Sequence, residues 1–252
     1  MSDASKFDAP FLSVAIISFN EERIIEKTLS AIHDLADEII VVDSFSTDNT
    51  LEIVKRFKAS IIQRKWEGYS KQKNFAISQC YGQWILALDA DEVVIPALKS
   101  EILQIIKTPG SYAGFKIKRK LFIGDRWIKY GGYYPDYQLR LFKNNVGAKF
   151  NYREVHESLL LDGNVGYLNN PLEHYAYENL EEYRFVLEKY AMLASREVKN
   201  KSVYFPKLRA IWTFVFRYLF RFGFLEGYTG LKITKAYSSY VYKKYKTAEG
   251  LK

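Results

Sequence analysis

Short apolar runs alternate with amphipathic segments along the N-terminal part of the chain. The apolar runs are rich in β-branched residues, which is typical of strands buried in a sheet. They cover residues 11–19, 38–43, 59–64 and 83–89. The segments that follow them are predicted to be helical; in the first, Ile25, Leu29 and Ile32 recur at helical spacing. The predicted helices cover residues 20–35, 46–57, 70–80 and 97–107, with Ser70 as a candidate N-cap.

Strand–helix alternation of this kind predicts a parallel, doubly wound sheet. Ligands of such sheets bind outside the carboxyl ends of the strands. The polar stretches "SFNEE", "VVDS" and "LDADE" all fall at predicted strand ends. We therefore expect their side chains to converge on one crevice.

The pattern changes after Pro109, where short alternating runs and glycine turns predict a mixed or antiparallel extension. From Leu180 onward the apolar spacing is helical again. The expected fold class is α/β, with a doubly wound, mostly parallel sheet, a small antiparallel extension and a helical C-terminal region. The expected domains are residues 1–178, with halves 11–107 and 108–178, and a helical appendage over 179–252.

The composition fits a globular protein. Of the 252 residues, 48% are hydrophobic and 26% are charged, so a sizeable core is expected and global disorder is not. Cys80 is the only cysteine, which excludes an internal disulfide and fits a reducing, cytoplasmic compartment. The N-terminal residues "MSDASKFDAP" and the lack of a long uninterrupted apolar run predict neither a signal peptide nor a transmembrane helix.

The net charge of +8 suits an anionic membrane surface, a phosphorylated ligand or nucleic acid. The tail is both aromatic and basic, and Arg217 and Arg221 lie four positions apart on one predicted helix face. We expect these arginines to reach lipid phosphates while aromatic side chains enter the interface. This predicts a peripheral protein on the inner face of the cytoplasmic membrane. The alternative is a helix pair packed on the catalytic domain or on a second copy in a homodimer.

Three acids, Asp89, Asp91 and Glu92, directly follow a predicted buried strand. Carboxylates this close repel one another, so a basic side chain or a metal ion should compensate them. Asp89 and Asp91 are two positions apart and would point the same way from an extended chain. Such a pair suits Mn²⁺ or Mg²⁺ bound together with substrate phosphates. The alternative is a solvated turn that starts the next helix.

Taken in order, "SVAIISFNEERIIEKTLSAI", "VVDS", "KQKN" and "LDADE" resemble glycosyltransferase family 2. The later "YQLRLF", "VHESL" and "GFLEGYTGLKI" resemble its lipopolysaccharide core β-1,4-glucosyltransferase branch. The resemblance implies a GT-A fold and an inverting hexosyltransferase. It also implies a UDP-sugar donor, with UDP-glucose as the usual case of the branch, and a glycolipid or saccharide acceptor.

By the same resemblance, one group of residues would contact the donor nucleotide. These are Ser18, Phe19, Asn20, Glu22, Asp43, Lys73 and Asp89. A carboxylate at Asp43 suits the N–H of uracil or the hydroxyls of ribose, which are hydrogen-bond donors. The alternative for Asp43 is a start signal for the following helix, and the alternative for Lys73 is a place on a solvated helix face.

Inverting transfer to a hydroxyl needs one general base. Among Asp125, Asp136, Glu154 and Glu157, we favour Glu157, because the branch carries a similar Val-His-Glu. Asp136, beside Gly-Gly and Pro, is the second candidate. Either could instead be a surface carboxylate.

The metal shell and the diphosphate need further side chains. Asp89 and Asp91 are the expected carboxylate ligands, and a histidine, His156 or His174, is expected to complete the shell, as in some GT-A enzymes. Arg140 is a candidate for the diphosphate, although an arginine on a strand is more often a surface residue.

Two other function classes remain open from the sequence. A sugar nucleotidyltransferase also uses paired aspartates, but it normally begins with a glycine-rich basic loop that "IISFNEERI" lacks. A basic RNA- or nucleotide-binding module would not need converging acids. We therefore expect no nucleic-acid partner.

Overall fold

The computed structural model describes residues 11–152, 157–196, 198 and 205–250. The chain forms two compact units. The first unit comprises Met1–Arg119, Tyr137–Arg153 and Glu157–His174, and the second comprises Lys120–Asp136, Glu154–His156 and Tyr175–Lys252. Strands β6, β8 and β12 contribute residues to both units.

The first unit is built on four parallel strands. These are β1 (Leu12–Ser18), β2 (Glu38–Asp43), β3 (Ser60–Gln63) and β4 (Trp84–Asp89). Their order in the sheet is β3-β2-β1-β4, and each neighbouring pair is parallel. The predicted parallel arrangement is therefore confirmed.

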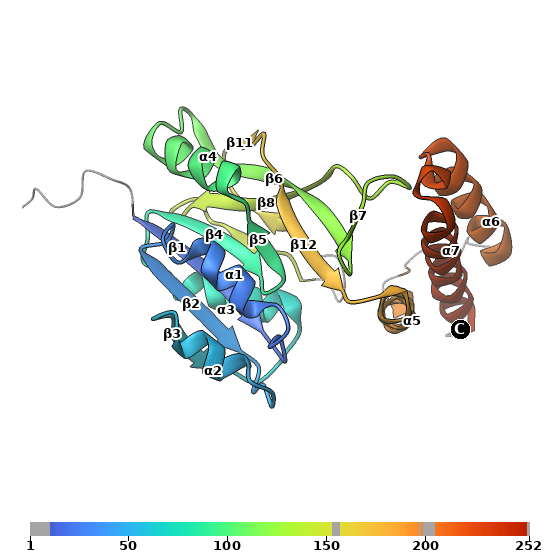
Figure 1. Ribbon diagram of the computed structural model, residues 1–252, viewed down its shortest axis with the longest axis horizontal. Helices are drawn as coiled ribbons and strands as arrows, with labels where there is room; N and C mark the ends of the chain where they lie inside the picture. The colour runs from blue at the N-terminus through green and yellow to red at the C-terminus, as the bar shows by residue number, and fades with distance from the viewer. Residues whose placement is uncertain (1–10, 153–156, 197, 199–204, 251–252) are drawn as a thin grey trace, which may run out of the picture. The chain divides into compact units, whose positions relative to one another are not determined.

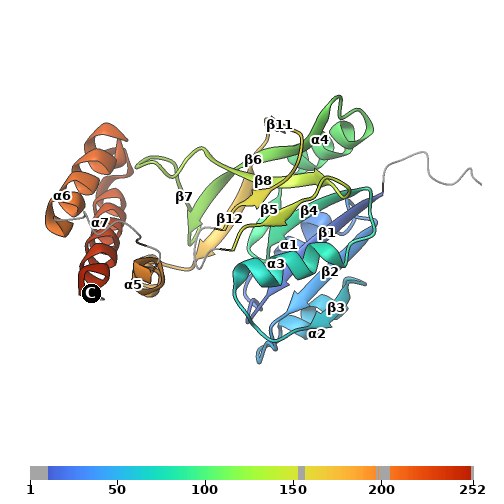
Figure 2. The same ribbon diagram turned by 180° about the vertical axis from the view of Figure 1, so that it is seen from behind.

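Helices lie on both faces of this sheet. They are α1 (Ile25–Ile32), α2 (Thr50–Lys55), α3 (Tyr69–Ser78) and α4 (Pro96–Lys107). Successive strand residues point to opposite faces: Val14 and Ile16 pack in one apolar cluster with α1 and α4, and Ala15 packs in another with α3. Figure 1 shows α1 in front of the sheet, and Figure 2, from behind, shows α3. The sheet is thus doubly wound.

The remaining strands form the predicted extension. They are β5 (Glu92–Val94), β6 (Tyr112–Ile123), β7 (Arg126–Ile128), β8 (Asp136–Lys143), β9 (Lys149–Phe150), β10 (Leu159–Leu160), β11 (Asn164–Tyr167) and β12 (Leu172–Tyr177). Strand β8 pairs antiparallel with β4, and β12 pairs antiparallel with β5. The antiparallel extension is therefore confirmed.

Two local predictions differ from the structure. Ser70 is not an N-cap, because α3 already begins at Tyr69 and the Ser70 hydroxyl donates a hydrogen bond of 2.7 Å to the carbonyl of Asn151. Glu92 does not start a helix. It begins the short strand β5, so the alternative of a solvated turn that leads into a helix does not hold.

The second unit is mainly helical. It contains α5 (Leu180–Arg196), α6 (Pro206–Val215), a π-helix η1 (Phe216–Phe220), a 3₁₀ turn η2 (Gly223–Glu226) and α7 (Gly227–Gly250). Its core joins Tyr183, Leu187 and Ala191 of α5 to Ile233 and Tyr240 of α7. Among the described residues, no helix combines the length and apolar character needed to cross a bilayer.

Arg217 does not take the position expected from its spacing. Its guanidinium lies over the rings of Tyr133 and Tyr237, at 4.3 and 4.0 Å from their centroids. Its Nε is buried. The expectation that Arg217 reaches lipid phosphates is therefore wrong, whereas Arg221 is exposed.

Candidate active site

Three polar residues end neighbouring parallel strands. Ser18 of β1 is in register with Asp43 of β2, and Ile17 of β1 is in register with Asp89 of β4. The carboxyl ends of the three strands therefore lie side by side, as expected for a crevice in a doubly wound sheet.

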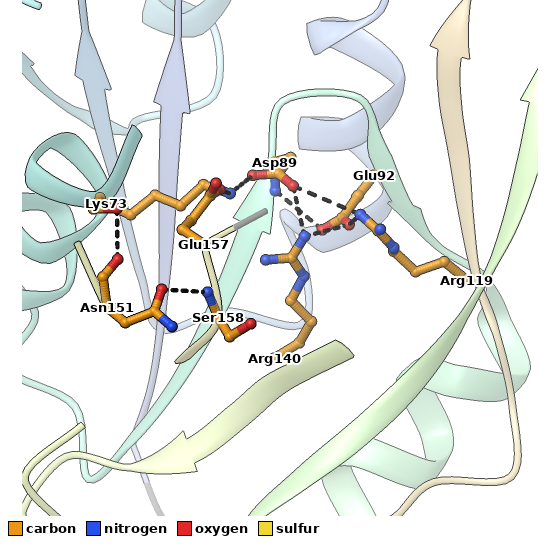
Figure 3. A network of polar contacts seen from close by, with 9 residues as sticks. Lys73, Asp89, Glu92, Arg119, Arg140, Asn151, Glu157 and Ser158 are labelled. Carbon is orange, nitrogen blue, oxygen red and sulfur yellow. Dashed lines mark hydrogen bonds and ion pairs between the residues drawn. The ribbon is translucent and has the colours of Figure 1, made fainter. Parts of the chain in front are cut away.

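Asp89 is compensated by basic side chains. Its carboxylate accepts from Lys73 Nζ at 2.6 Å and from Arg140 Nη2 at 2.5 Å (Figure 3). Burial by itself would raise the pKa of Asp89, but the charges of Arg140 and Lys73 outweigh burial and hold that pKa well below its usual range. Neither partner is near Asp89 in the sequence. The compensating charge therefore comes from other elements, α3 and β8.

Glu92 binds two arginines, and one of them, Arg140, also contacts Asp89. Its fully buried carboxylate accepts from Arg140 Nη2 at 2.6 Å and from Arg119 Nη1 at 2.9 Å. It also accepts a hydrogen bond of 3.1 Å from the backbone N–H of Asp89. Arg140 is itself buried, so its interpretation as a surface residue is wrong. Arg119 was not identified from the sequence; the only signal is its place in the basic run "KIKRK".

Asp91 pairs with a histidine rather than with these cations. Its Oδ2 lies 3.2 Å from His174 Nε2, and the two side chains are about equally accessible, at 20% and 17%. His174 reaches this position because β12 pairs with β5 and places His174 opposite Glu92. Burial would raise the pKa of Asp91, but His174 outweighs it and lowers that pKa.

Glu157 lies against the same lysine as Asp89. Its Oε1 accepts a hydrogen bond of 2.7 Å from Lys73 Nζ. The Asn74 amide holds the neighbouring strand β9, since it donates to the carbonyl of Phe150 at 2.9 Å and accepts from its N–H at 2.7 Å. Asn151 Oδ1 accepts from the N–H of Ser158 at 2.9 Å. Asn74 thus fastens β9 to α3, and Figure 3 shows Asn151 bonded to Ser158, the residue after Glu157.

Four other candidates fall outside the described residues of the first unit. Glu154 and His156 fall outside the described residues. Asp136 begins β8 and belongs to the second unit, whereas Glu157 belongs to the first. Asp125 follows Gly124 at the turn between β6 and β7, also in the second unit.

The loops after β1 and β2 are bonded to each other. Asn20 Oδ1 accepts from the N–H of Thr47 at 2.8 Å, and Glu22 Oε2 accepts from the N–H of Asn49 at 3.0 Å. Asn20 adopts a positive φ of 55°, which asparagine tolerates better than most residues. Phe19 is exposed. The side chains at these positions therefore shape a rigid rim at the strand ends.

Asp43 is completely buried within this rim. Its Oδ1 accepts from the hydroxyls of Ser18 at 3.0 Å and Ser46 at 2.5 Å, and its Oδ2 accepts from the N–H of Ser46 at 2.8 Å. A donor ligand would have to share these acceptor positions or displace Ser46.

Glu21 is a site residue that sequence reasoning missed in favour of Glu22. Burial and the nearby charges of Asp91 and Asp89 raise the pKa of Glu21 to about 8, against a smaller lowering by Arg23. Glu21 therefore carries a proton at neutral pH in the metal-free protein. The double acid in "NEE" was the only sequence signal.

The acids do not form a large metal cluster. Across the ranges that the structure describes, no group of three or more His, Cys, Asp and Glu side chains is arranged to hold a metal ion. Mg²⁺ and Mn²⁺, however, are often bound by one or two protein ligands together with substrate phosphates. The oxygen of Asp91 and the nitrogen of His174 fit such a two-ligand site. Asp89 fits less well, because Lys73 and Arg140 already occupy its carboxylate.

Comparison with known proteins finds a matching family and similar curated proteins. Residues 13–159 match glycosyl transferase family 2. The lipopolysaccharide core biosynthesis glycosyltransferase LpsC of Rhizobium meliloti is 29% identical over 241 residues, covering 87% of this chain and 87% of LpsC. An uncharacterized glycosyltransferase of Rickettsia typhi is 29% identical over 235 residues, covering 87% of this chain and 80% of its own.

A solved structure has a similar fold. S. aureus TarS 1–349, in complex with UDP, superposes with a TM-score of 0.50 at 18% identity, covering 94% of this chain and 91% of that one. At this identity the likeness shows the fold alone, and it confirms the expected fold class. The family match covers more than half of the sequence and includes the strands that carry the charged site. It shows that this chain belongs to glycosyl transferase family 2.

Proposed function

We propose that this glycosyltransferase moves a hexose, with inversion, from a UDP-sugar to a hydroxyl of a glycolipid or saccharide acceptor such as a lipopolysaccharide core. The observation that supports this most is the convergence at the strand ends of Asp91 with His174 and of Lys73 with Glu157. UDP-glucose is the proposed donor.

The rim formed by the loops after β1 and β2 supports a nucleoside pocket. We assign Ser18, Phe19, Asn20 and Glu22 to its lining and Asp43 to the uracil or ribose. The mutual hydrogen bonds of Asn20 and Glu22 with the β2 loop would pre-organise this pocket before the donor binds.

Cations next to the rim suit the donor diphosphate. Lys73, Arg119 and Arg140 already gather around Asp89 and Glu92. Arg119 is within reach of Asp89 as well, at 3.9 Å. A charged ammonium and planar guanidinium groups both bind phosphate oxygens well. Lys73 and Asp89 are therefore assigned to the nucleotide-binding part of the site.

Asp91 and His174 would hold Mn²⁺ or Mg²⁺. When bound, the metal ion supplies positive charge to the leaving diphosphate. Asp89 was expected as a second carboxylate ligand. Its pairing with Lys73 and Arg140 suits instead a role in positioning these cations.

Glu157 is the proposed general base. It would accept the proton of the acceptor hydroxyl while the hydroxyl oxygen bonds to the anomeric carbon and the bond from that carbon to the diphosphate oxygen breaks. The electron pair of the broken bond leaves with UDP. Asp136 remains the second candidate for this role.

The acceptor and the location are proposed together. A lipid-borne acceptor is presented at a membrane, and we place the enzyme peripherally on the inner face of the cytoplasmic membrane. Residues 1–178 would carry the transferase and residues 179–252 the appendage that contacts the membrane, with a homodimer contact as the competing role.

Donor hydrolysis, measured across UDP- and GDP-sugars with Mn²⁺, Mg²⁺ or a chelator, tests the proposed function. The expected result is hydrolysis of a UDP-hexose that the chelator abolishes. Hydrolysis of GDP-sugars alone, or equal rates with the chelator, would reject the proposed donor or the proposed metal.

A further inference from the structure

One face of the helical segment from Pro206 to Phe220 is apolar and exposed. Its exposed residues recur at helical spacing through α6 and η1. We call them the apolar stripe: Leu208, Ile211, Trp212, Phe216, Leu219 and Phe220. Trp212 and Phe220 each expose 61% of their surface, although large aromatic side chains are normally buried.

The rings of the stripe contact one another. The Trp212 centroid lies 6.2 Å from those of both Phe216 and Phe220, and the centroids of Phe216 and Phe220 are 6.3 Å apart. The stripe is therefore one continuous apolar surface and not a scatter of single exposed residues, which would need no explanation.

The opposite face of α6 is already covered. Pro206 and Ala210 are buried there, and the Ser238 hydroxyl of α7 donates a hydrogen bond of 2.7 Å to the carbonyl of Ala210. Arg209 lies over the ring of Tyr245 in α7 at 4.8 Å. Figure 1 shows α6 alongside α7. Packing within the second unit thus leaves the stripe as the outer face of α6.

The turn after the stripe is closely packed. A Cβ added at Gly230 would lie 2.0 Å from the carbonyl oxygen of Gly223, so the two backbones can approach only with glycine here. The Glu226 carboxylate accepts hydrogen bonds from the N–H groups of Lys129 and Tyr130, at 2.8 and 3.0 Å. Arg217 fixes the end of the helix between Tyr133 and Tyr237. The stripe is therefore presented by a well-packed scaffold.

The exposed charges of the segment that carries the stripe have one sign. Residues 205–235 contain six basic residues and a single acid, Glu226, which is buried and paired with Arg126. The exposed basic residues are Lys207, Arg209, Arg221, Lys232 and Lys235. An aromatic face on a segment whose exposed charges are all basic complements an anionic lipid surface.

We propose that the apolar stripe inserts into the headgroup boundary of an anionic lipid bilayer, with the surrounding lysines and arginines on the lipid phosphates. Insertion supplies apolar burial that charge alone cannot, and the basic side chains can extend to the phosphates while their stems lie along the apolar surface. The inference deepens the proposed membrane location and names the surface responsible. It does not depend on the transfer chemistry.

A second copy of the chain is a less suitable occupant. In a two-fold dimer the same patch meets itself, so two segments with only basic exposed charges would face each other. Like charges across an interface oppose association. A lipid surface supplies the opposite charge.

Co-sedimentation of the full chain with vesicles tests the inference. The vesicles are either phosphatidylcholine alone or phosphatidylcholine with phosphatidylglycerol, at low and high salt. The stripe variant is Trp212→Ser/Phe220→Ser. The matched control, Tyr81→Ser/Phe185→Ser, removes two exposed aromatic rings outside the stripe.

We expect the wild type and the control to bind anionic vesicles, and the stripe variant to bind at least about tenfold more weakly, because it loses two large apolar contacts. Lipids with brominated acyl chains should quench the tryptophan fluorescence of the wild type. This quenching should disappear in a Trp212→Phe variant that still binds the vesicles. Partial binding should persist at high salt, since apolar insertion is not screened.

Three results would overturn the inference. The wild type could remain in the supernatant, or bind without quenching and detach fully at high salt, which would be adsorption by charge alone. The third result is a wild-type dimer that does not bind lipid and that the stripe mutations dissociate. Donor hydrolysis, measured in the same samples without vesicles, separates these results from failure of the proposed function.

Discussion

Lys73 donates a hydrogen bond of 2.7 Å to Glu157, a residue 84 positions later in the chain. The same ammonium group lies 2.6 Å from Asp89. Burial would lower the pKa of Lys73, but Asp89 and, to a smaller extent, Glu157 outweigh burial and raise it. The buried Lys73 ammonium group thus links Asp89 to Glu157, the proposed base. A donor diphosphate placed near Lys73 would compete with both carboxylates for it.

The Glu157→Gln variant should retain UDP binding and lose transfer. A general base contributes roughly 10² to 10⁴ in rate, and the amide keeps the shape of the side chain without accepting the proton. Calorimetry with UDP and single-turnover transfer measure the two properties separately. Asp136→Asn is the comparison: if it is inactive while Glu157→Gln transfers at nearly the wild-type rate, the base is Asp136.

The Asp91→Ala and His174→Ala variants should lose the gain in UDP affinity that Mn²⁺ provides. Each removes one of only two proposed protein ligands, so we expect a loss of roughly a hundredfold or more for Asp91→Ala. Titration calorimetry with and without Mn²⁺ measures it. His33→Ala, which changes an exposed histidine at the end of α1, is the control. Wild-type affinity of Asp91→Ala for UDP with Mn²⁺ would exclude the proposed metal site.

The Glu92→Gln variant should destabilise the fold by about 3 to 5 kcal/mol, because removing one partner of a buried ion pair leaves uncompensated charge on the other. Here Arg119 and Arg140 would both lose their shared carboxylate. Urea unfolding gives the free energy. Glu52→Gln, which breaks an exposed pair with Lys55, should change it by less than about 1 kcal/mol. Equal effects of the two substitutions would mean that Glu92 does not anchor the arginines.

Glu21 should make the metal-free protein less stable as the pH rises. The unfolded chain releases the Glu21 proton near pH 4.5, while the folded protein keeps it until about pH 8. Between these values the folded state binds more protons, so the free energy of unfolding falls with rising pH. In Glu21→Gln, which has no proton to release, this decline should be shallower. Urea midpoints at pH 5 and pH 8.5 in a chelator measure it, and equal declines in both proteins would contradict the assignment.

The sequence alone was sufficient for the parallel sheet and for the meeting of polar residues at its strand ends. Strand and helix periodicity are local properties, so the alternation of buried runs with helical segments predicted β1 to β4 in a parallel sheet. The polar residues at the ends of these runs then had to meet, because parallel strands bring their carboxyl ends to one edge. Asp43 and Asp89 follow from this reasoning directly.

The partners of the acids were decided only by the tertiary structure. No basic residue lies beside Asp89 in the sequence, yet Lys73 from α3 and Arg140 from β8 compensate it. His174 meets Asp91 because of the pairing between β5 and β12. Such pairings depend on strand register between distant segments, which no local pattern specifies.

Arg217 illustrates the same limit on a helix. Its spacing from Arg221 predicted one shared helix face, but only Arg217 lies in a helix, because η1 ends at Phe220 and Arg221 follows as its non-helical C-cap. Spacing also does not determine which face of a helix is covered. In the folded chain Tyr133 and Tyr237 enclose Arg217, while Trp212 and Phe220 remain exposed. Periodicity along a chain fixes which residues share a face; the elements that pack against the helix decide whether that face meets protein or solvent.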